Sequence, residues 1–236
     1  MSVQPRRAYP SDAVSDTVRL SGVGFGYEAT HRALRDVDLT LPAGSFHFLT
    51  GPSGAGKSTL LTLLTLAEQP TVGTLHLFGE DVTAAPRRDL PAFRRRMGVV
   101  FQDFRLLDHL SAFDNVALPL RLTGGTRADY AADVEEMLDW VGLGDRMDDR
   151  PAAFSGGEKQ RLAIARAVVS KPDLILADEP TGSVDAAMGE RLLKLFQSLN
   201  RLGTTVLIAS HDEALAERSG ATVLKLDGGR LTGAAA

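Results

Sequence analysis

Residues 51–59 read Gly-Pro-Ser-Gly-Ala-Gly-Lys-Ser-Thr, which fits the phosphate-loop pattern G-x-x-x-x-G-K-S/T. A largely apolar run over residues 46–49 precedes the loop, and a helix-like run over residues 58–68 follows it. This is the order of strand, loop and helix that the motif requires. Its glycines let backbone N–H groups turn inward around phosphate oxygens, and the start of the following helix favours an anion. The sequence therefore predicts a site for a nucleoside triphosphate.

Each residue of this loop is a candidate ligand of the nucleotide. The Lys57 side chain supplies a mobile positive charge for the terminal phosphates, and the Ser58 hydroxyl is placed to bind Mg²⁺. The candidate nucleotide ligands in the loop are Gly51, Pro52, Ser53, Gly54, Ala55, Gly56, Lys57, Ser58 and Thr59.

The composition is that of a globular protein with one large or two small domains: 236 residues, 44% hydrophobic and 24% charged, with a formal net charge of −4. This charge gives no global reason to expect a nucleic-acid partner. The absence of cysteine excludes disulfides and thiolate metal sites. No apolar run approaches the roughly 18 residues that cross a bilayer, so any membrane contact is expected through a partner. Residues 1–17 lack the apolar core of a signal peptide and are expected to be a disordered tail, and residues 232–236 a short C-terminal tail.

Short strand-like runs alternate with helical patterns, which predicts an α/β fold. The runs over residues 174–178 and 205–210 are almost entirely apolar, as strands of a parallel sheet buried on both faces are. Earlier runs alternate more, which suits an antiparallel sheet at the edge of the domain. We expect one domain over residues 18–231, interrupted by a helical subdomain at about residues 103–172. The other expected elements are strands at 18–23, 37–41, 45–50, 74–78 and 98–101, helices at 130–141 and 188–202, and a hairpin at 222–231.

Polar side chains follow the two most apolar runs. Asp178 and Glu179 come at the end of one run, and His211 follows the other. Because ligands of α/β sheets bind at the carboxyl ends of strands, Asp178 is expected to hold Mg²⁺ and Glu179 to polarise the water that attacks the γ-phosphate. His211 would position Glu179 or that water. The alternatives are a solvated turn before Pro180 and a purely structural histidine.

Gln102 and Tyr27 are two further candidates. The amide of Gln102, which follows the run at 98–101, is a candidate ligand of Mg²⁺ or water and a candidate link to the helical subdomain. Tyr27 is a candidate for stacking on a nucleotide base. Each of these residues is ambiguous when taken alone.

The stretch Ser155-Gly156-Gly157-Glu158 opens a helix and has two interpretations. Its exposed N–H groups and the helix dipole make a second anion site. Because one chain has only one γ-phosphate to bind, such a site indicates a second subunit. The alternative is a capping box, in which a serine and a glutamate three residues later satisfy each other's backbone N–H groups.

The order of these motifs resembles the ATP-binding cassette (ABC) ATPases over residues 18–231. In the terms of that family the motifs resemble the A-loop, Walker A, Q-loop, signature, Walker B, D-loop and H-switch. The residues that carry this resemblance are Tyr27, Gly51 to Thr59, Gln102, Ser155 to Glu158, Asp178, Glu179, Asp185 and His211. The resemblance implies an ABC-type P-loop NTPase core with a helical signature subdomain, and an ATPase that uses ATP and Mg²⁺. It also implies a homodimer that forms on ATP binding, with each ATP held between the phosphate loop of one copy and residues 155–158 and Asp185 of the other.

Within that family, residues 48–59, 95–103, 106–107, 114–120 and 165–169 resemble most the FtsE-like group of cell-division ATPases. This resemblance implies a peripheral protein at the cytoplasmic face of the inner membrane, paired with an integral membrane protein of FtsX type that controls peptidoglycan hydrolases during septation. The segment at residues 104–115 is the expected docking site for this partner. The alternative is the ATPase subunit of a lipoprotein-releasing or macrolide exporter (LolD-like or MacB-like). A chromosome-structure ATPase would need a long heptad-rich insert, which is absent, and a nucleotide-gated scaffold without turnover would not need Glu179 and His211.

Overall fold

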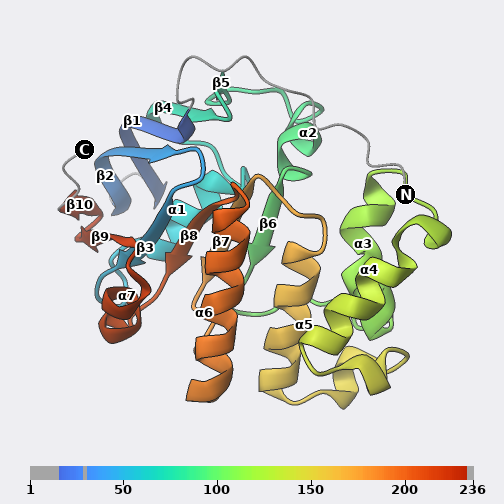
Figure 1. Ribbon diagram of the computed structural model, residues 1–236. Helices are drawn as coiled ribbons and strands as arrows, with labels where there is room; N and C mark the ends of the chain where they lie inside the picture. The colour runs from blue at the N-terminus through green and yellow to red at the C-terminus, as the bar shows by residue number, and fades with distance from the viewer. Residues whose placement is uncertain (1–15, 29–30, 233–236) are drawn as a thin grey trace.

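The computed structural model describes residues 16–28 and 31–232; the side chains of residues 27, 28, 31 and 32 are not described. Two sheets and a set of helices form a layered α/β fold (Figure 1). The expected N-terminal tail falls largely outside the described residues, and Asp16 and Thr17 already belong to the first strand. Residues 233–236 of the expected C-terminal tail also lie outside them.

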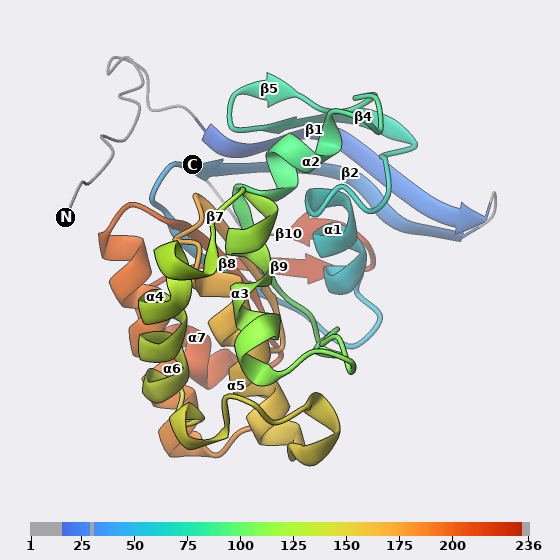
Figure 2. The same ribbon diagram turned by 90° about the vertical axis from the view of Figure 1, so that its right-hand side faces the viewer.

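The first sheet is antiparallel and has the strand order β2-β1-β4-β5. Its strands are β1 (Asp16–Glu28), β2 (His31–Pro42), β4 (Val72–Leu77) and the short β5 (Glu80–Asp81). This sheet is the antiparallel edge that the sequence predicts, but two of the earlier runs expected in it, at residues 45–50 and 98–101, belong instead to the parallel sheet. In Figure 2 the antiparallel sheet lies at the top of the view.

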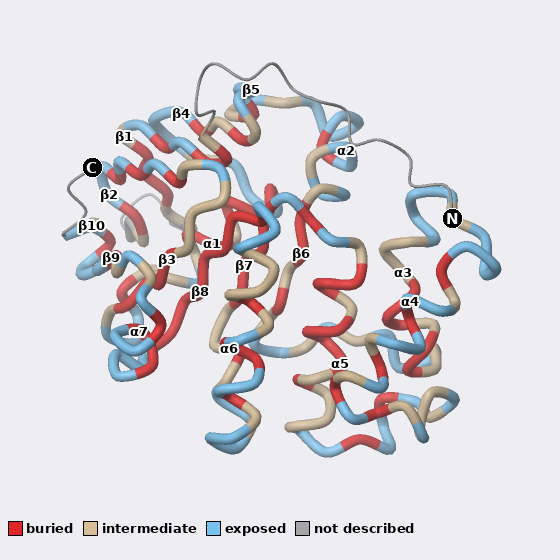
Figure 3. The backbone as a smooth tube through the Cα atoms, viewed as in Figure 1, coloured by how far each residue is buried: buried red, intermediate tan, exposed pale blue. Residues whose placement is uncertain are grey.

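The second sheet has the order β10-β9-β3-β8-β7-β6, and every pairing except that of β10 with β9 is parallel. Its strands β7 and β8 are buried along almost their whole length, as predicted (Figure 3). The six strands are β3 (Phe46–Thr50), β6 (Met97–Val100), β7 (Leu174–Asp178), β8 (Thr205–Ala209), β9 (Thr222–Asp227) and β10 (Arg230–Thr232).

The core has three parts. Helix α1 (Lys57–Leu64) packs its leucines against both sheets. Helices α6 (Ala186–Arg201) and α7 (Glu213–Ser219) cover the other face of the parallel sheet together with one side of α5 (Gly156–Val168). The third cluster joins α5 to α3 (Ala112–Leu122) and α4 (Arg127–Trp140). The remaining helices are α2 (Leu90–Arg94) and the 3-10 turns η1 (Gly144–Arg146) and η2 (Pro151–Ala153).

The predicted α/β class, antiparallel edge and helical insertion are confirmed, since α3, α4 and α5 all lie between β6 and β7. One helix is shorter than predicted, because α1 ends at Leu64 rather than near Glu68. Leu66 has φ 58, a left-handed conformation that an α-helix does not tolerate. Among the described residues no helix combines the length and apolar character that a bilayer span needs.

His47 on β3 gives the fold a predicted dependence on pH. Its side chain is 6% exposed, its Nδ1 has no hydrogen-bond partner among the described residues, and burial lowers its pKa. The unfolded chain therefore binds the proton more readily, and the free energy of unfolding falls as the pH drops below about 6.5. The slope from this residue is at most about 1.4 kcal/mol per pH unit. Urea unfolding at pH 7, 6 and 5 should show a flatter dependence for His47→Val; an unchanged slope would contradict the assignment.

Candidate functional site

The phosphate loop joins β3 to α1, and its glycines are required by the backbone. Gly51 has φ 149 and Gly56 has φ 108, which L side chains rarely adopt. A Cβ at Gly51 would lie 2.0 Å from the carbonyl oxygen of Leu226, and one at Gly56 would lie 2.7 Å from that of Ala33. The loop therefore packs closely against β9 and β2 at these two glycines, where a side chain would not fit.

Lys57 begins α1 and bends back over the loop. Its Nζ donates to the carbonyl oxygens of Gly51 at 2.6 Å and Pro52 at 3.1 Å. These contacts keep the positive charge above the loop, at the start of a helix that also favours an anion.

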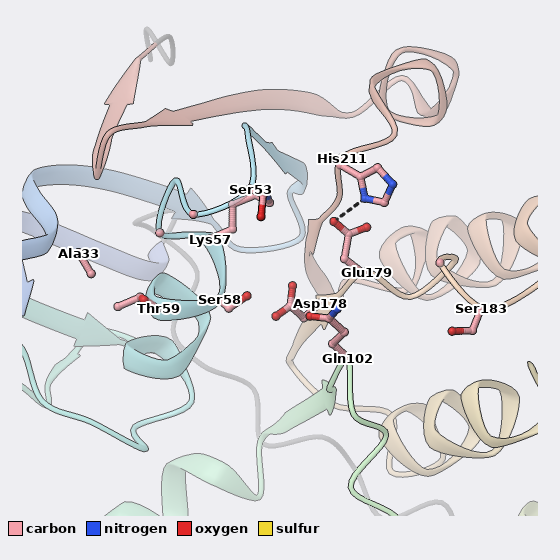
Figure 4. Close-up of a pocket in the computed structure, with 13 residues that line it drawn as sticks. Ala33, Ser53, Lys57, Ser58, Thr59, Gln102, Asp178, Glu179, Ser183 and His211 are labelled. Carbon is pink, nitrogen blue, oxygen red and sulfur yellow. Dashed lines mark ion pairs between the residues drawn. The ribbon is translucent and has the colours of Figure 1, made fainter. Parts of the chain in front are cut away.

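A cavity of about 490 Å³ opens beside the loop (Figure 4). It gathers residues that are far apart in the sequence, because the carboxyl ends of neighbouring parallel strands meet at one edge of the sheet. Ten residues that the sequence predicts line it: Ser53, Gly54, Gly56, Lys57, Ser58, Thr59, Gln102, Asp178, Glu179 and His211. The other described residues that line it are Ala33, Gly182 and Ser183; the last two lie three and four residues after Glu179, and this position is the sequence signal that could have found them.

Asp178 ends β7 and lies next to the start of α1. Burial raises the pKa of Asp178, a hydrogen bond from the Ser58 hydroxyl and the charge of Lys57 oppose this rise, and the charge of Glu179 adds to it. A divalent cation would offset the cost of this buried charge. The oxygens of Ser58, Asp178 and Gln102, which line the same cavity, are the hard ligands that Mg²⁺ prefers, so the residues fit this metal.

Glu179 is held in place by two neighbours on the adjacent strand end. Its Oε1 lies 2.9 Å from His211 Nδ1, and its Oε2 accepts a hydrogen bond from the Ser210 hydroxyl at 3.3 Å. Glu179 has φ 49, and its backbone N–H donates to Ala209 O at 2.9 Å. The Glu179 side chain is only 16% exposed, whereas that of His211 is 75% exposed, so the histidine is the more solvent-exposed of the two. A left-handed residue at the end of a buried strand is typical of a functional site.

The Ser155–Glu158 turn does not line this cavity. It forms the capping box that was one of its two interpretations: Glu158 Oε2 accepts from the Ser155 backbone N–H at 2.8 Å, and Ser155 Oγ accepts from the Glu158 N–H at 3.4 Å. Glu158 Oε1 pairs with Arg146 at 2.7 Å. The hydrogen bond from the Ser155 backbone, and then the other contacts of Ser155 and Arg146, lower the pKa of Glu158. The start of the helix is therefore capped by its own side chains, and a Cβ at Gly156 would meet open space.

Four more predicted ligands with described side chains are absent from the cavity lining, namely Gly51, Pro52, Ala55 and Asp185. Asp185 caps α6 by accepting from the Met188 N–H at 2.8 Å. Tyr27 is the penultimate residue of β1, and its side chain lies outside the described residues, so base stacking stays a prediction. The residues between Glu179 and Asp185 connect the cavity to the Ser155–Glu158 turn, because a Cβ at Gly157 would lie 3.0 Å from Ser183 O.

A second, apolar groove of about 450 Å³ runs between the end of β6 and helices α3 and α5. Its apolar residues include Met97, Val99, Phe101, Leu118 and Leu122, and Leu122 is 68% exposed. Of the docking segment predicted at residues 104–115, only Arg105 lines this groove.

Known proteins are similar to this chain over most of its length. The family model described as ABC transporter matches residues 34–182. The cell division ATP-binding protein FtsE of Escherichia coli (strain K12) is 44% identical over 216 residues, which cover 92% of this chain and 97% of FtsE. The methionine import ATP-binding protein MetN of Chromohalobacter salexigens is 44% identical over 200 residues but only 57% of its length is covered.

Solved structures of ABC transporter cassettes are also similar to this chain. The dimeric structure of MJ0796, a bacterial ABC transporter cassette, has a TM-score of 0.87 and 33% identity, covering 92% of this chain and 97% of the other. A second dimeric structure of MJ0796, in a post-hydrolysis state bound to ADP and Pi, has a TM-score of 0.86. The chain therefore belongs to the ABC transporter family, within which it is an ABC-type ATPase similar to FtsE.

Proposed function

We propose that this chain is the ATP-hydrolysing subunit of an FtsEX-like membrane complex in cell division. ATP-driven dimer closure would drive an integral membrane partner of FtsX type that controls peptidoglycan hydrolases. The observation that carries this proposal is the match to FtsE, which spans 97% of that protein, together with a cavity that brings Lys57, Asp178 and Glu179 together. The similarity to MetN leaves a large part of that protein unmatched, so it supports the cassette rather than the transport role.

The cavity residues have distinct proposed roles. Residues 51–59 bind the phosphates of ATP, and Tyr27 stacks on the base. Ser58, Asp178 and Gln102 hold Mg²⁺, which supplies positive charge to the phosphates when bound. Glu179 accepts the proton of the attacking water, and His211 touches the γ-phosphate and positions Glu179 or that water.

Residues 155–158 and Asp185 would act on the ATP of a second copy. They lie outside the chain's own cavity, and the capping box occupies the N–H groups of Ser155 and Glu158 but not those of Gly156 and Gly157 at the start of the helix. The dimeric forms of MJ0796 support this arrangement. Because this contact exists only while the γ-phosphate is present, hydrolysis would let the two copies separate. We call this pair of copies held together by ATP the dimer clamp.

Ser155→Ala tests this role, with Ser111→Ala as a matched control. Both serines cap a helix by accepting a backbone N–H, Ser155 from Glu158 and Ser111 from Asp114, so each change should cost about 1 kcal/mol of stability. Only Ser155→Ala is expected to lower ATP turnover, by about 10-fold, because it removes a phosphate ligand worth about 1.5 kcal/mol. A phosphate-release assay measures the ATP turnover of both variants. Equal turnover in the two variants would count against the dimer clamp.

The proposed place of the protein is the cytoplasmic face of the inner membrane, where it binds as a peripheral subunit and contacts no nucleic acid. The apolar groove between β6, α3 and α5 is the proposed docking site for the membrane partner, since it exposes Leu122 beside the turn that contains Gln102. Membrane contact would then occur through the partner alone.

The biological role is tested by depletion of the protein in its own host. We expect a division defect with normal lipoprotein sorting, and co-purification with a four-span membrane protein. Defective lipoprotein sorting or macrolide sensitivity with normal division would instead indicate the ATPase of a LolD-like or MacB-like exporter.

A further inference from the structure

Arg166, near the end of α5, donates two hydrogen bonds to consecutive backbone carbonyls. Its Nη1 lies 2.6 Å from Arg105 O and its Nη2 lies 2.7 Å from Phe104 O. Within the described part of the chain Arg166 forms no ion pair, and burial lowers the pKa of its guanidinium. Partial burial of a charge without an ionic partner is costly, and the two hydrogen bonds to carbonyls offset part of this cost.

The backbone that Arg166 holds is strained. Phe104 has φ 61 and Arg105 has φ 45, two consecutive left-handed residues that are not glycine. The turn is closed by bonds from the Phe104 N–H to Phe101 O at 3.1 Å and from the Arg105 N–H to Asp103 O at 2.7 Å. Such a conformation persists only where its surroundings enforce it, and the planar fork of Arg166 does this by binding both carbonyls at once.

Gln102 lies inside this turn, between Phe101 and Asp103. It lines the nucleotide cavity, and no hydrogen bond of its side chain occurs within the described residues. Its position is therefore set by the backbone on either side of it. In Figure 4 the Gln102 side chain extends from the end of β6 toward Ser58 and Asp178.

We propose that Arg166 is a positioning residue for catalysis: by clamping the Phe104 and Arg105 carbonyls, it holds Gln102 in the nucleotide cavity. Arg166 also lies on the helix that begins at the Ser155–Glu158 turn, about 15 Å away along the helix axis at 1.5 Å per residue. The two hydrogen bonds of Arg166 thus connect the position of Gln102 in one site to helix α5, whose other end would contact the second ATP of the dimer. This inference rests on the role proposed above for Gln102.

The experiment uses the full-length protein and the variants Arg166→Leu, Arg166→Lys and Gln102→Ala, with each Arg166 change also combined with Gln102→Ala. Lysine keeps the charge but cannot bond both carbonyls in one plane. Arg191→Leu is the matched control, because Arg191 also donates to a backbone carbonyl, Trp140 O at 3.1 Å, away from the cavity.

Both Arg166 variants should lower kcat about 10-fold or more, as a misplaced group does, and raise the Mg²⁺ concentration needed for half-maximal turnover. The ATP dissociation constant measured without Mg²⁺ should change less than about twofold, whereas Arg191→Leu should alter none of these values. In the Gln102→Ala background the Arg166 changes should have little further effect on kcat. Without nucleotide or metal, the amides of Phe104 and Arg105 should exchange hydrogen faster in both variants.

Two results would overturn the inference alone: an Arg166 effect of the same size with and without Gln102, or full turnover and unchanged amide exchange in Arg166→Lys. Normal turnover of Gln102→Ala itself would remove both this inference and the proposed role of Gln102. Arg166→Lys keeps the test decisive if Arg166→Leu does not fold.

Discussion

Glu179→Gln is expected to reduce ATP turnover by about 10²- to 10⁴-fold, the usual contribution of a general base, while ATP binding persists. The amide keeps the shape of the side chain, and its oxygen can still accept from His211, which lies 2.9 Å from Glu179 Oε1. It loses only the ability to accept a proton from the attacking water. Because hydrolysis is the step that opens the proposed clamp, the variant should accumulate as an ATP-bound dimer.

Phosphate release and sedimentation with ATP measure the two effects of Glu179→Gln. The control is Glu190→Gln, which changes an exposed carboxylate on α6 that lies 3.5 Å from Arg218 and should leave both values as in the parent protein. Turnover of Glu179→Gln within about threefold of the parent would remove Glu179 from the role of base. A variant that stalls hydrolysis but stays monomeric with ATP would leave the base in place and refute the clamp.

Most residues that line the cavity could be predicted, because each belongs to a short sequence pattern. The phosphate loop is a contiguous motif, and Gln102, Asp178 and His211 each follow an apolar run. Strands β6, β7 and β8 are neighbours in one parallel sheet, so residues after their carboxyl ends converge. The resemblance to ABC ATPases supplied the assignment of roles that these sequence patterns left open.

The contacts that tune the cavity were not predictable in this way. Arg166 bonds carbonyls 61 and 62 residues away, and nothing in the spacing of the chain marks this pairing. The same is true of the approach of Gly157 to Ser183. Such contacts depend on how the helical subdomain docks onto the sheet, which periodicity does not encode. The predicted end of α1 was wrong for a local reason. Leu66 adopts a left-handed conformation, and a leucine in an apolar run gives no sequence signal for it.

Lys57→Ala is expected to weaken ATP binding by roughly 10- to 100-fold, since a hydrogen bond to a charged group contributes about 1.5–3 kcal/mol. The change removes the charge at the start of α1 and its bonds to Gly51 O and Pro52 O. Titration with a fluorescent ATP analogue measures the loss. Lys194→Ala, which removes an exposed lysine on α6, is the control and should bind as tightly as the parent protein.

A mixture of two impaired variants extends the test of Lys57 to the dimer. If each ATP lies between Lys57 of one copy and Ser155 of the other, a heterodimer of Lys57→Ala with Ser155→Ala contains one site with both changes and one site with neither. The mixture should therefore recover turnover that exceeds the sum of the two separate variants. If both groups instead served the ATP of the same copy, every site in the mixture would carry a defect, and turnover would stay at the sum. A loss of stability in either variant could not produce this recovery. Recovered turnover would therefore show that Lys57 of one copy and Ser155 of the other act on the same ATP.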